Sequence, residues 1–158
     1  PWREVCQTRD FVLVAPVAAA DDTWQPTEAE FVRKALDHVT DAYNVDDTRI
    51  VTGGYQAGGT FAALVALGNI EVIRGVALVD AAPPARVAMP SSDPLLRFAF
   101  FISTAKESEV NERIDAAAKR LTENKLPVTR HNLGGQPAPW SEAQRSEFAR
   151  WVDALDRI

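Results

Sequence analysis

Apolar residues follow one another in two different ways along this chain. Short continuous apolar runs suit strands that are buried on both faces of a parallel sheet, whereas apolar residues spaced three and four apart suit amphipathic helices. The continuous runs predict five strands, at residues 11–15, 50–52, 72–80, 96–103 and 127–133.

The stretches before, between and after these runs have helical spacing. Capping boxes, in which a Ser or Thr is followed three residues later by Glu or Gln, mark two helix starts. Thr27 with Glu30 forms one such pair, and Ser141 with Gln144 forms the other. The predicted helices cover residues 2–8, 28–43, 57–68, about 108–124 and the stretch that follows residue 141.

Strands and helices therefore alternate along the whole chain. Strict alternation implies right-handed β-α-β crossovers, and it predicts an α/β fold with a mainly parallel, doubly wound sheet of about five strands and helices on both faces. Ligands bind beyond the carboxyl ends of the strands in such sheets. We expect the loops that follow the strands to share one rim, near residues 16–26, 53–58, 80–92, 103–108 and 133–140.

Composition narrows the class of protein. The 158 residues suit a single domain, 1–158, and 46% hydrophobic with 25% charged residues is typical of a globular chain. A formal net charge of −5 without a Lys/Arg cluster argues against nucleic acid as a partner. No apolar run reaches the roughly 18 residues of a membrane span. Cys6 is the only cysteine, so no internal disulfide forms, and no His/Cys/carboxylate spacing indicates a metal site.

The chain begins with Pro1-Trp2 and has no initiator methionine or signal-peptide pattern. We expect it to be a fragment or the C-terminal domain of a longer polypeptide, whose other domains are its first partners. The expected source is bacterial, and the expected location is exported or periplasmic.

A glycine-rich turn lies between the predicted strand at 50–52 and the Ala/Leu-rich helix that follows. In the nucleophile elbow, G-x-S-x-G, a sharp strand-to-helix turn presents a reactive serine at the top of the sheet. Here the five residues are Gly54-Tyr55-Gln56-Ala57-Gly58, and Gln56 stands at the serine position. A carboxamide cannot begin acyl transfer, because it has no ionisable proton at usable pH and no comparably nucleophilic oxygen.

Two other interpretations of this turn are compatible with its glycine spacing. Gly53-x-x-x-x-Gly58-Gly59-Thr60 has the spacing of a phosphate-binding loop, but Gly59 replaces the lysine that meets the phosphates. The glycines could instead have only a structural role, letting the helix pack tightly on the sheet, with Gln56 as a polar residue at its start. The pattern alone leaves this structural alternative open.

The segment Asp46-Asp47-Thr48-Arg49-Ile50-Val51-Thr52-Gly53-Gly54-Tyr55-Gln56-Ala57-Gly58-Gly59 resembles the nucleophile region of α/β-hydrolase esterases, particularly the polyhydroxybutyrate-depolymerase and feruloyl-esterase-like group. The order of elements is similar over nearly the whole chain, while residue-level similarity is confined to 46–64. The resemblance implies that the family's first strands and oxyanion-hole loop would precede Pro1.

Carried over position by position, the resemblance implies a degenerate catalytic triad. Gln56 occupies the nucleophile position, and Gln136 aligns with the histidine in the loop after the last strand. The acid should follow the strand that ends near Ser103, where Glu107 or Glu109 could serve. With two of the three positions changed to glutamine, the resemblance implies a catalytically inactive domain.

The function that we expect is therefore that of a pseudo-hydrolase: a binding or structural module of a larger protein, with no metal and no cofactor. The former cleft could hold a small polar ligand, a glycan or a peptide. The predicted binding residues are Trp24, Tyr55, Gln56, Ala57, Gln136 and Trp140.

The alternative is an active serine-type esterase or peptidase that uses an unrecognised nucleophile. Such an enzyme would need His131 or another base to activate a hydroxyl group, and no spacing supports a particular pair. His131 is expected on the last strand, and His38 and Cys6 are interpreted as structural. The hydroxyl candidates are Tyr55, Thr60, Ser91 and Ser92.

Overall fold

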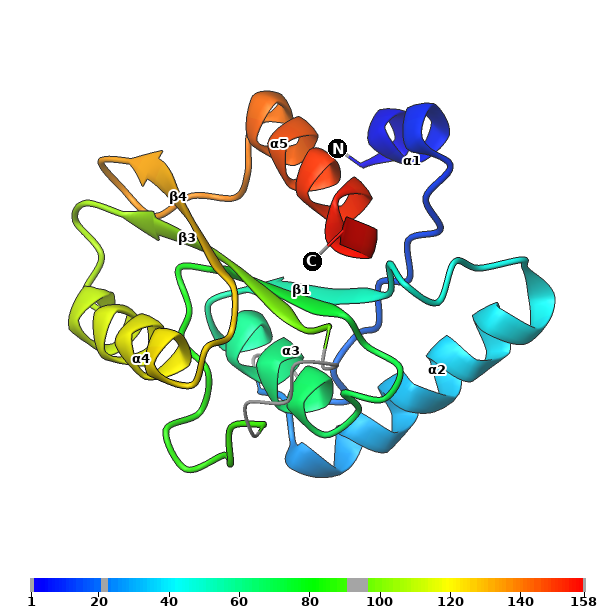
Figure 1. The fold of residues 1–158 in the computed structure, drawn as a ribbon, viewed down its shortest axis with the longest axis horizontal. Coiled ribbons are helices and arrows are strands. Elements are labelled where there is room, and N and C mark those ends of the chain that lie inside the picture. Colours follow the sequence, from blue (N-terminus) through cyan, green and yellow to red (C-terminus); the bar gives the residue numbers. More distant parts are fainter. Residues whose placement is uncertain (1, 21–22, 91–96, 158) are drawn as a thin grey trace.

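The computed structural model describes residues 2–20, 23–90 and 97–157. Their centre is a parallel sheet whose strands lie in the order β1-β2-β3-β4 (Figure 1). This arrangement confirms the predicted parallel α/β fold, with four strands in the described part of the chain. The strands are β1 (Val51–Tyr55), β2 (Gly75–Val79), β3 (Ala99–Ala105) and β4 (Val128–Gly134).

Helices cover both faces of the sheet, as the alternation predicted. Helices α1 and α5 lie on one face, while α2, α3 and α4 lie on the other (Figure 1). None of the helices in the described residues is long and apolar enough to cross a membrane. The helices are α1 (Arg3–Arg9), α2 (Ala29–Ala42), α3 (Ala57–Leu67), α4 (Asn111–Glu123) and α5 (Glu142–Asp153), with 3-10 turns η1 (Pro26–Glu28) and η2 (Leu155–Arg157).

Strand β3 joins two apolar clusters, one on each face of the sheet. Successive side chains of a strand point to opposite faces, so Phe100 and Ile102 enter the cluster under α3 and α4, and Phe101 enters the cluster under α5. All three side chains are buried. This two-sided burial is the reason that the strand has a continuous apolar sequence.

The fifth strand predicted at 11–15 is wrong. Val12, Leu13 and Val14 are 49%, 54% and 40% exposed, and the segment belongs to neither a strand nor a helix. A strand needs a neighbour that accepts and donates its backbone hydrogen bonds. No described strand pairs with 11–15, so its hydrophobicity alone does not produce the predicted structure.

Strand β1 is an edge of the sheet. The carbonyl of Ile50 accepts from Arg74 N–H at 2.8 Å, and Gln56 N–H donates to Val79 at 2.9 Å, so alternate residues of β1 face β2. Val51, Gly53 and Tyr55 turn their peptide groups to the other side. No strand pairs with that side among residues 2–20, 23–90 and 97–157.

One of the two predicted capping boxes is confirmed. The N–H of Ser141 donates to Gln144 Oε1 at 2.8 Å, and the hydroxyl of Ser141 accepts from Gln144 N–H at 3.4 Å. The box predicted at Thr27 and Glu30 is wrong, because the chain begins a 3-10 turn at Pro26 and the box forms two residues earlier.

In the observed box, the side chain of Glu28 accepts from the backbone N–H of Gln25 at 2.5 Å and of Ala19 at 2.7 Å. These donors favour the ionised carboxylate and lower the pKa of Glu28, the bond from Gln25 contributing most. Glu28 therefore holds the start of α2 and the preceding loop together.

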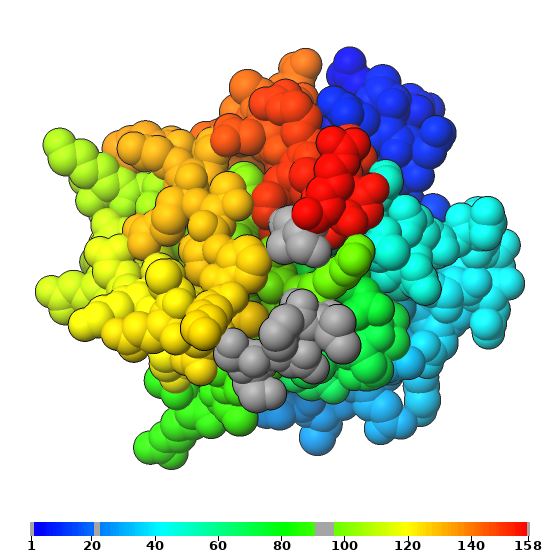
Figure 2. Space-filling model, viewed as in Figure 1, coloured from blue at the N-terminus to red at the C-terminus, as the bar shows by residue number. Residues whose placement is uncertain are grey.

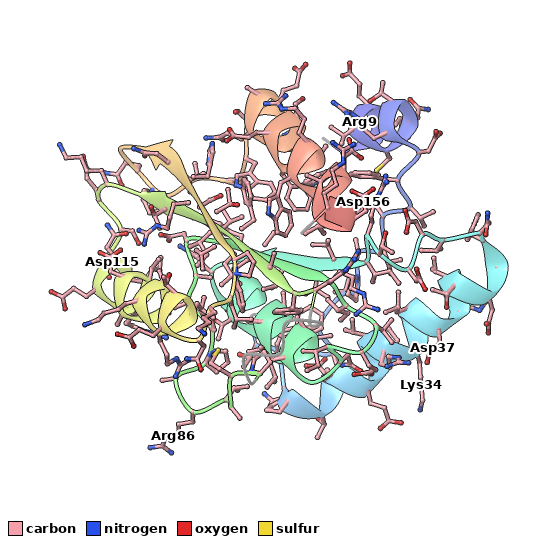
Figure 3. All side chains as sticks on the ribbon, in the orientation of Figure 1. Arg9, Lys34, Asp37, Arg86, Asp115 and Asp156 are labelled. Carbon is pink, nitrogen blue, oxygen red and sulfur yellow. The ribbon has the colours of Figure 1, made fainter. Side chains whose placement is uncertain are left out.

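Ion pairs connect the C-terminal segment to α1 and to the residue before β1. Arg9 of α1 contacts Asp153 at 2.7 Å, and Arg49, just before β1, contacts Asp156 at 3.1 Å. Figure 2 shows the surfaces of α1 and the C-terminal segment next to each other, and Figure 3 shows Arg9 and Asp156 at this end of the molecule. Because these side chains are about one-third exposed, each pair contributes at most about 1 kcal/mol.

Candidate functional site

Gln56 lies at the turn where β1 passes into α3. Its backbone has φ 48° and ψ −117°, a left-handed conformation that a residue with a side chain adopts at a cost of about 1–3 kcal/mol. Its N–H continues the ladder to Val79, and its side-chain Nε2 donates to Asp80 Oδ2 at 3.3 Å. The strand-to-helix elbow predicted from the glycine spacing is therefore present, with a carboxamide at its tip.

Two of the four glycines in the turn are required by the close approach of α3 to the sheet. A Cβ on Gly59 would lie 2.6 Å from Ala81 Cβ and 2.7 Å from the Gly54 carbonyl oxygen, and a Cβ on Gly54 would overlap the backbone of Gly58. A Cβ on Gly58 would meet nothing closer than Trp24 Nε1 at 3.9 Å. The structural role left open by the sequence therefore holds for Gly54 and Gly59.

Asp80 follows β2 directly and lies beside the elbow. Its backbone is also left-handed, with φ 50°, and its N–H donates to Ser103 at 2.9 Å. Only 4% of the residue is exposed. Its Oδ2 accepts from Gln56, while its buried Oδ1 has no hydrogen-bond partner among the described residues. Asp80 was not among the site residues predicted from the sequence, where the one signal is an acidic residue directly after a buried apolar strand.

The loops after all four strands meet at one cleft of about 430 Å³. Tyr55 of β1 is level with Val79 of β2, and Val79 is level with Ser103 of β3, so the loops begin at the same edge of the sheet. The cleft is lined by Gln56, Ala57, Thr60, Asp80–Ala82, Glu107–Val110, Arg113, Gln136 and Pro137.

The three positions expected for a degenerate triad, Gln56, Glu107 and Gln136, all line this cleft. Gln136 Nε2 donates to Glu107 Oε2, so two of these three side chains are in direct contact. Backbone bonds hold these two loops together, since Glu107 N–H donates to Gly135 at 2.8 Å. The carboxylate of Glu107 thus meets a neutral donor rather than a cation.

The predicted aromatic residues lie outside the lining of the cleft. Trp24 stacks on Phe61 with ring centroids 4.4 Å apart and nearly parallel planes. Trp140 donates from Nε1 to Ser103 Oγ at 3.0 Å and packs against Phe101. Tyr55 is 36% exposed at the end of β1. Of the predicted binding residues, Gln56, Ala57 and Gln136 line the cleft.

Neither histidine approaches the cleft. His131 lies on β4 as predicted, where Nε2 contacts Glu147 Oε2 at 3.0 Å and the ring stacks on Phe101. His38 lies on the exposed side of α2. Within the described residues no Ser or Thr hydroxyl is hydrogen-bonded to a histidine, and Thr60 donates instead to the Ala82 carbonyl at 3.1 Å. Ser91 and Ser92, which were candidate nucleophiles, lie outside the described residues.

No metal centre is built from the described side chains. Among residues 2–20, 23–90 and 97–157, no group of three or more His, Cys, Asp or Glu side chains is placed to hold an ion. The acidic side chains of the cleft are therefore spread over its wall rather than gathered at one point.

Solved structures with a similar fold include a carboxylesterase and an α/β hydrolase. A Bacillus cereus carboxylesterase superposes with a TM-score of 0.58 at 21% identity, over 88% of this chain and 67% of that protein. The Francisella virulence factor BioJ superposes with a TM-score of 0.63 at 13% identity, over 87% of this chain and 62% of that protein. MGS-M1, an α/β hydrolase from a Medee basin deep-sea metagenome library, superposes with a TM-score of 0.64 at 16% identity, over 91% of this chain and 69% of that protein.

These similarities define the fold class: the chain has an α/β-hydrolase-like fold. It spans between 62% and 69% of the length of these three proteins. No protein-family model and no curated protein matches its sequence.

Proposed function

We propose that this chain is a non-catalytic esterase-like domain, related to the polyhydroxybutyrate-depolymerase and feruloyl-esterase-like group, whose cleft binds a small polar ligand within a larger protein. The observation that supports this most directly is the side chain of Gln56. It occupies the tip of the elbow, lines the cleft and donates to Asp80 at 3.3 Å. The nucleophile position thus holds a recognition group.

The second supporting observation is the Gln136–Glu107 contact. A general base must accept a proton from the nucleophile, and a neutral carboxamide does not do so at ordinary pH. Gln56 and Gln136 both line the cleft. On this proposal Gln56 stands where a nucleophile would attack, and Gln136 stands where a base would accept the proton. Both amides can donate and accept hydrogen bonds, which suits binding of a ligand with several polar atoms.

The proposal predicts that the purified domain does not react with esterase probes. A fluorophosphonate should label no residue, and an activated ester such as p-nitrophenyl acetate should give no burst above the buffer rate. The Gln56→Ser variant should also show no labelling and no burst, because the added hydroxyl still has no imidazole to act as its base. Labelling followed by intact-mass analysis and peptide mapping measures this outcome.

An active carboxylesterase of the same fold serves as the positive control for the probe, and heat-denatured domain serves as the negative control. Stoichiometric labelling of Thr60, or of any serine, would contradict the proposal and support the alternative of an active serine-type esterase or peptidase. Labelling of Gln56→Ser but not of the unchanged domain would show that a working base is present and only the nucleophile is lost.

A further inference from the structure

The lining of the cleft is acidic. Asp80, Glu107 and Glu109 contribute three carboxylates, and Arg113 contributes the one guanidinium, which leaves a formal charge of −2. The carboxamides of Gln56 and Gln136 add further acceptor atoms to the same wall. A carboxylate or phosphate ligand would meet like charge here, whereas a cation would meet opposite charge.

Asp80 is the buried carboxylate of this lining, and its hydrogen bonding is incomplete. Its residue surface is 96% buried, and its Oδ1 is without a hydrogen-bond partner in the part of the chain that the structure describes. Burying a carboxylate is costly unless it is paired or fully hydrogen-bonded. The Gln56 amide at 3.3 Å is the one side-chain donor that the described residues offer it, and that bond is long. Because Asp80 and Gln56 both line the cleft, a charged N–H donor of a ligand that displaces the Gln56 amide from Oδ2 would give this carboxylate a stronger partner.

The spacing of the acidic groups distinguishes an extended cation from a metal ion. The carboxylates come from separate loops, Asp80 after β2 and Glu107 with Glu109 after β3, and they do not converge on a point in the described structure. A primary ammonium carries three donors on one centre. Two such groups joined by a short carbon chain could contact both parts of the lining of a 430 Å³ cleft.

We propose that the cleft binds a small organic cation of the alkyl-diammonium class, with one ammonium group at Asp80 and Gln56 and the other at Glu107 and Glu109. This proposal rests on the proposed function of the cleft as a binding site and names its ligand class. It assigns Asp80, which sequence analysis missed, as the principal ligand-binding residue.

The test compares three compounds of equal chain length by isothermal titration calorimetry at low salt. The probes are 1,4-diaminobutane, 1,4-butanediol and succinate, which share a four-carbon backbone and differ in charge. We expect the diamine to bind with one-to-one stoichiometry, the diol to bind at least tenfold more weakly and the dicarboxylate not to bind. Added salt should weaken binding of the diamine, since it screens the attraction between the ammonium groups and the carboxylates.

Variants then locate the site. Asp80→Asn should weaken the diamine at least tenfold while the melting temperature stays the same or rises, because a buried charge is removed at nearly constant shape. Glu109→Gln should weaken it severalfold. Asp41→Asn is the matched control, since it makes the same chemical change at an exposed residue of α2 and should leave binding unchanged. If Asp80→Asn does not fold, the double variant Glu107→Gln with Glu109→Gln decides the question.

Binding of the diol or succinate at least as tightly as the diamine would overturn the proposal. So would the absence of diamine binding, or equal weakening by Asp41→Asn and Asp80→Asn, which would show unspecific attraction to an acidic chain. Failure of the broader proposal looks different. Fluorophosphonate labelling would show catalysis whatever the diamine does, and tight binding of a neutral ligand without labelling would leave a non-catalytic binder with the wrong ligand class.

Discussion

Replacing Phe100 with alanine should lower the free energy of unfolding by about 3–5 kcal/mol. Phe100 lies in β3, between β2 and β4, and its side chain is fully buried against α3 and α4. Its ring meets Phe98 edge to face, with centroids 5.3 Å apart. Alanine would remove apolar surface from the centre of the larger cluster and leave a cavity that the surrounding sheet cannot close. Urea denaturation followed by circular dichroism measures the change.

Phe31→Ala provides the control, because it makes the same substitution at a phenylalanine that is 55% exposed on α2. We expect it to cost no more than about 1 kcal/mol, which is usual for an exposed position. Since a domain of this kind is stable by about 5–15 kcal/mol, the loss at Phe100 is a large fraction of the total. Equal effects at the two positions would contradict the placement of the core around β3.

Replacing Gly59 with alanine should lower the free energy of unfolding by about 1–2 kcal/mol, because overpacking costs up to about 3 kcal/mol and the gain in helix propensity returns about 1 kcal/mol. The added methyl group would lie 2.6 Å from Ala81 Cβ and 2.7 Å from the carbonyl oxygen of Gly54. Neither atom belongs to a flexible side chain, so α3 itself would have to move away from β1 and β2. The higher helix propensity of alanine, about 1 kcal/mol, offsets only part of this cost.

Gly58→Ala is the matched control, one residue earlier on the same helix. The nearest atom to its added methyl group is Trp24 Nε1 at 3.9 Å, which is ordinary contact. This substitution should be neutral or stabilising by up to about 1 kcal/mol. Thermal and urea unfolding should therefore show a loss of stability for Gly59→Ala and none for Gly58→Ala. Destabilisation of the same size at both positions would show that the turn needs backbone freedom rather than close packing.

The fold followed from the sequence wherever local pattern and tertiary contact agree. Strand β3 is apolar throughout because both of its faces are buried, and β2 is shorter than predicted, Gly75–Val79 instead of 72–80, because sheet pairing rather than hydrophobicity fixes its ends. Residues 11–15 are also apolar, yet they pair with no strand in the described part of the chain, and Val12, Leu13 and Val14 stay exposed. A single sequence does not report which strands have partners.

The candidate site was predicted in part. Gln56 and Gln136 were found through the resemblance of the elbow segment, and the structure places both beside one cleft. Asp80 was missed because its significance comes from burial and from an oxygen without a partner, which only the assembled loops reveal. The stacking of Trp24 on Phe61 likewise depends on how α3 packs, and the loop position of Trp24 alone did not indicate it.

The edge position of β1 has a consequence for the behaviour of the chain in solution. Gly53 carries no side chain that could shield its peptide group. The exposed apolar residues 12–14 and 17 add hydrophobic surface that could contact another chain. Unprotected edges of this kind recruit further strands. Concentrated samples should therefore tend to self-associate, and a strand docked along Val51–Tyr55 would end next to Gln56. Self-association along β1 would then place a second chain beside the entrance of the cleft that Gln56 lines.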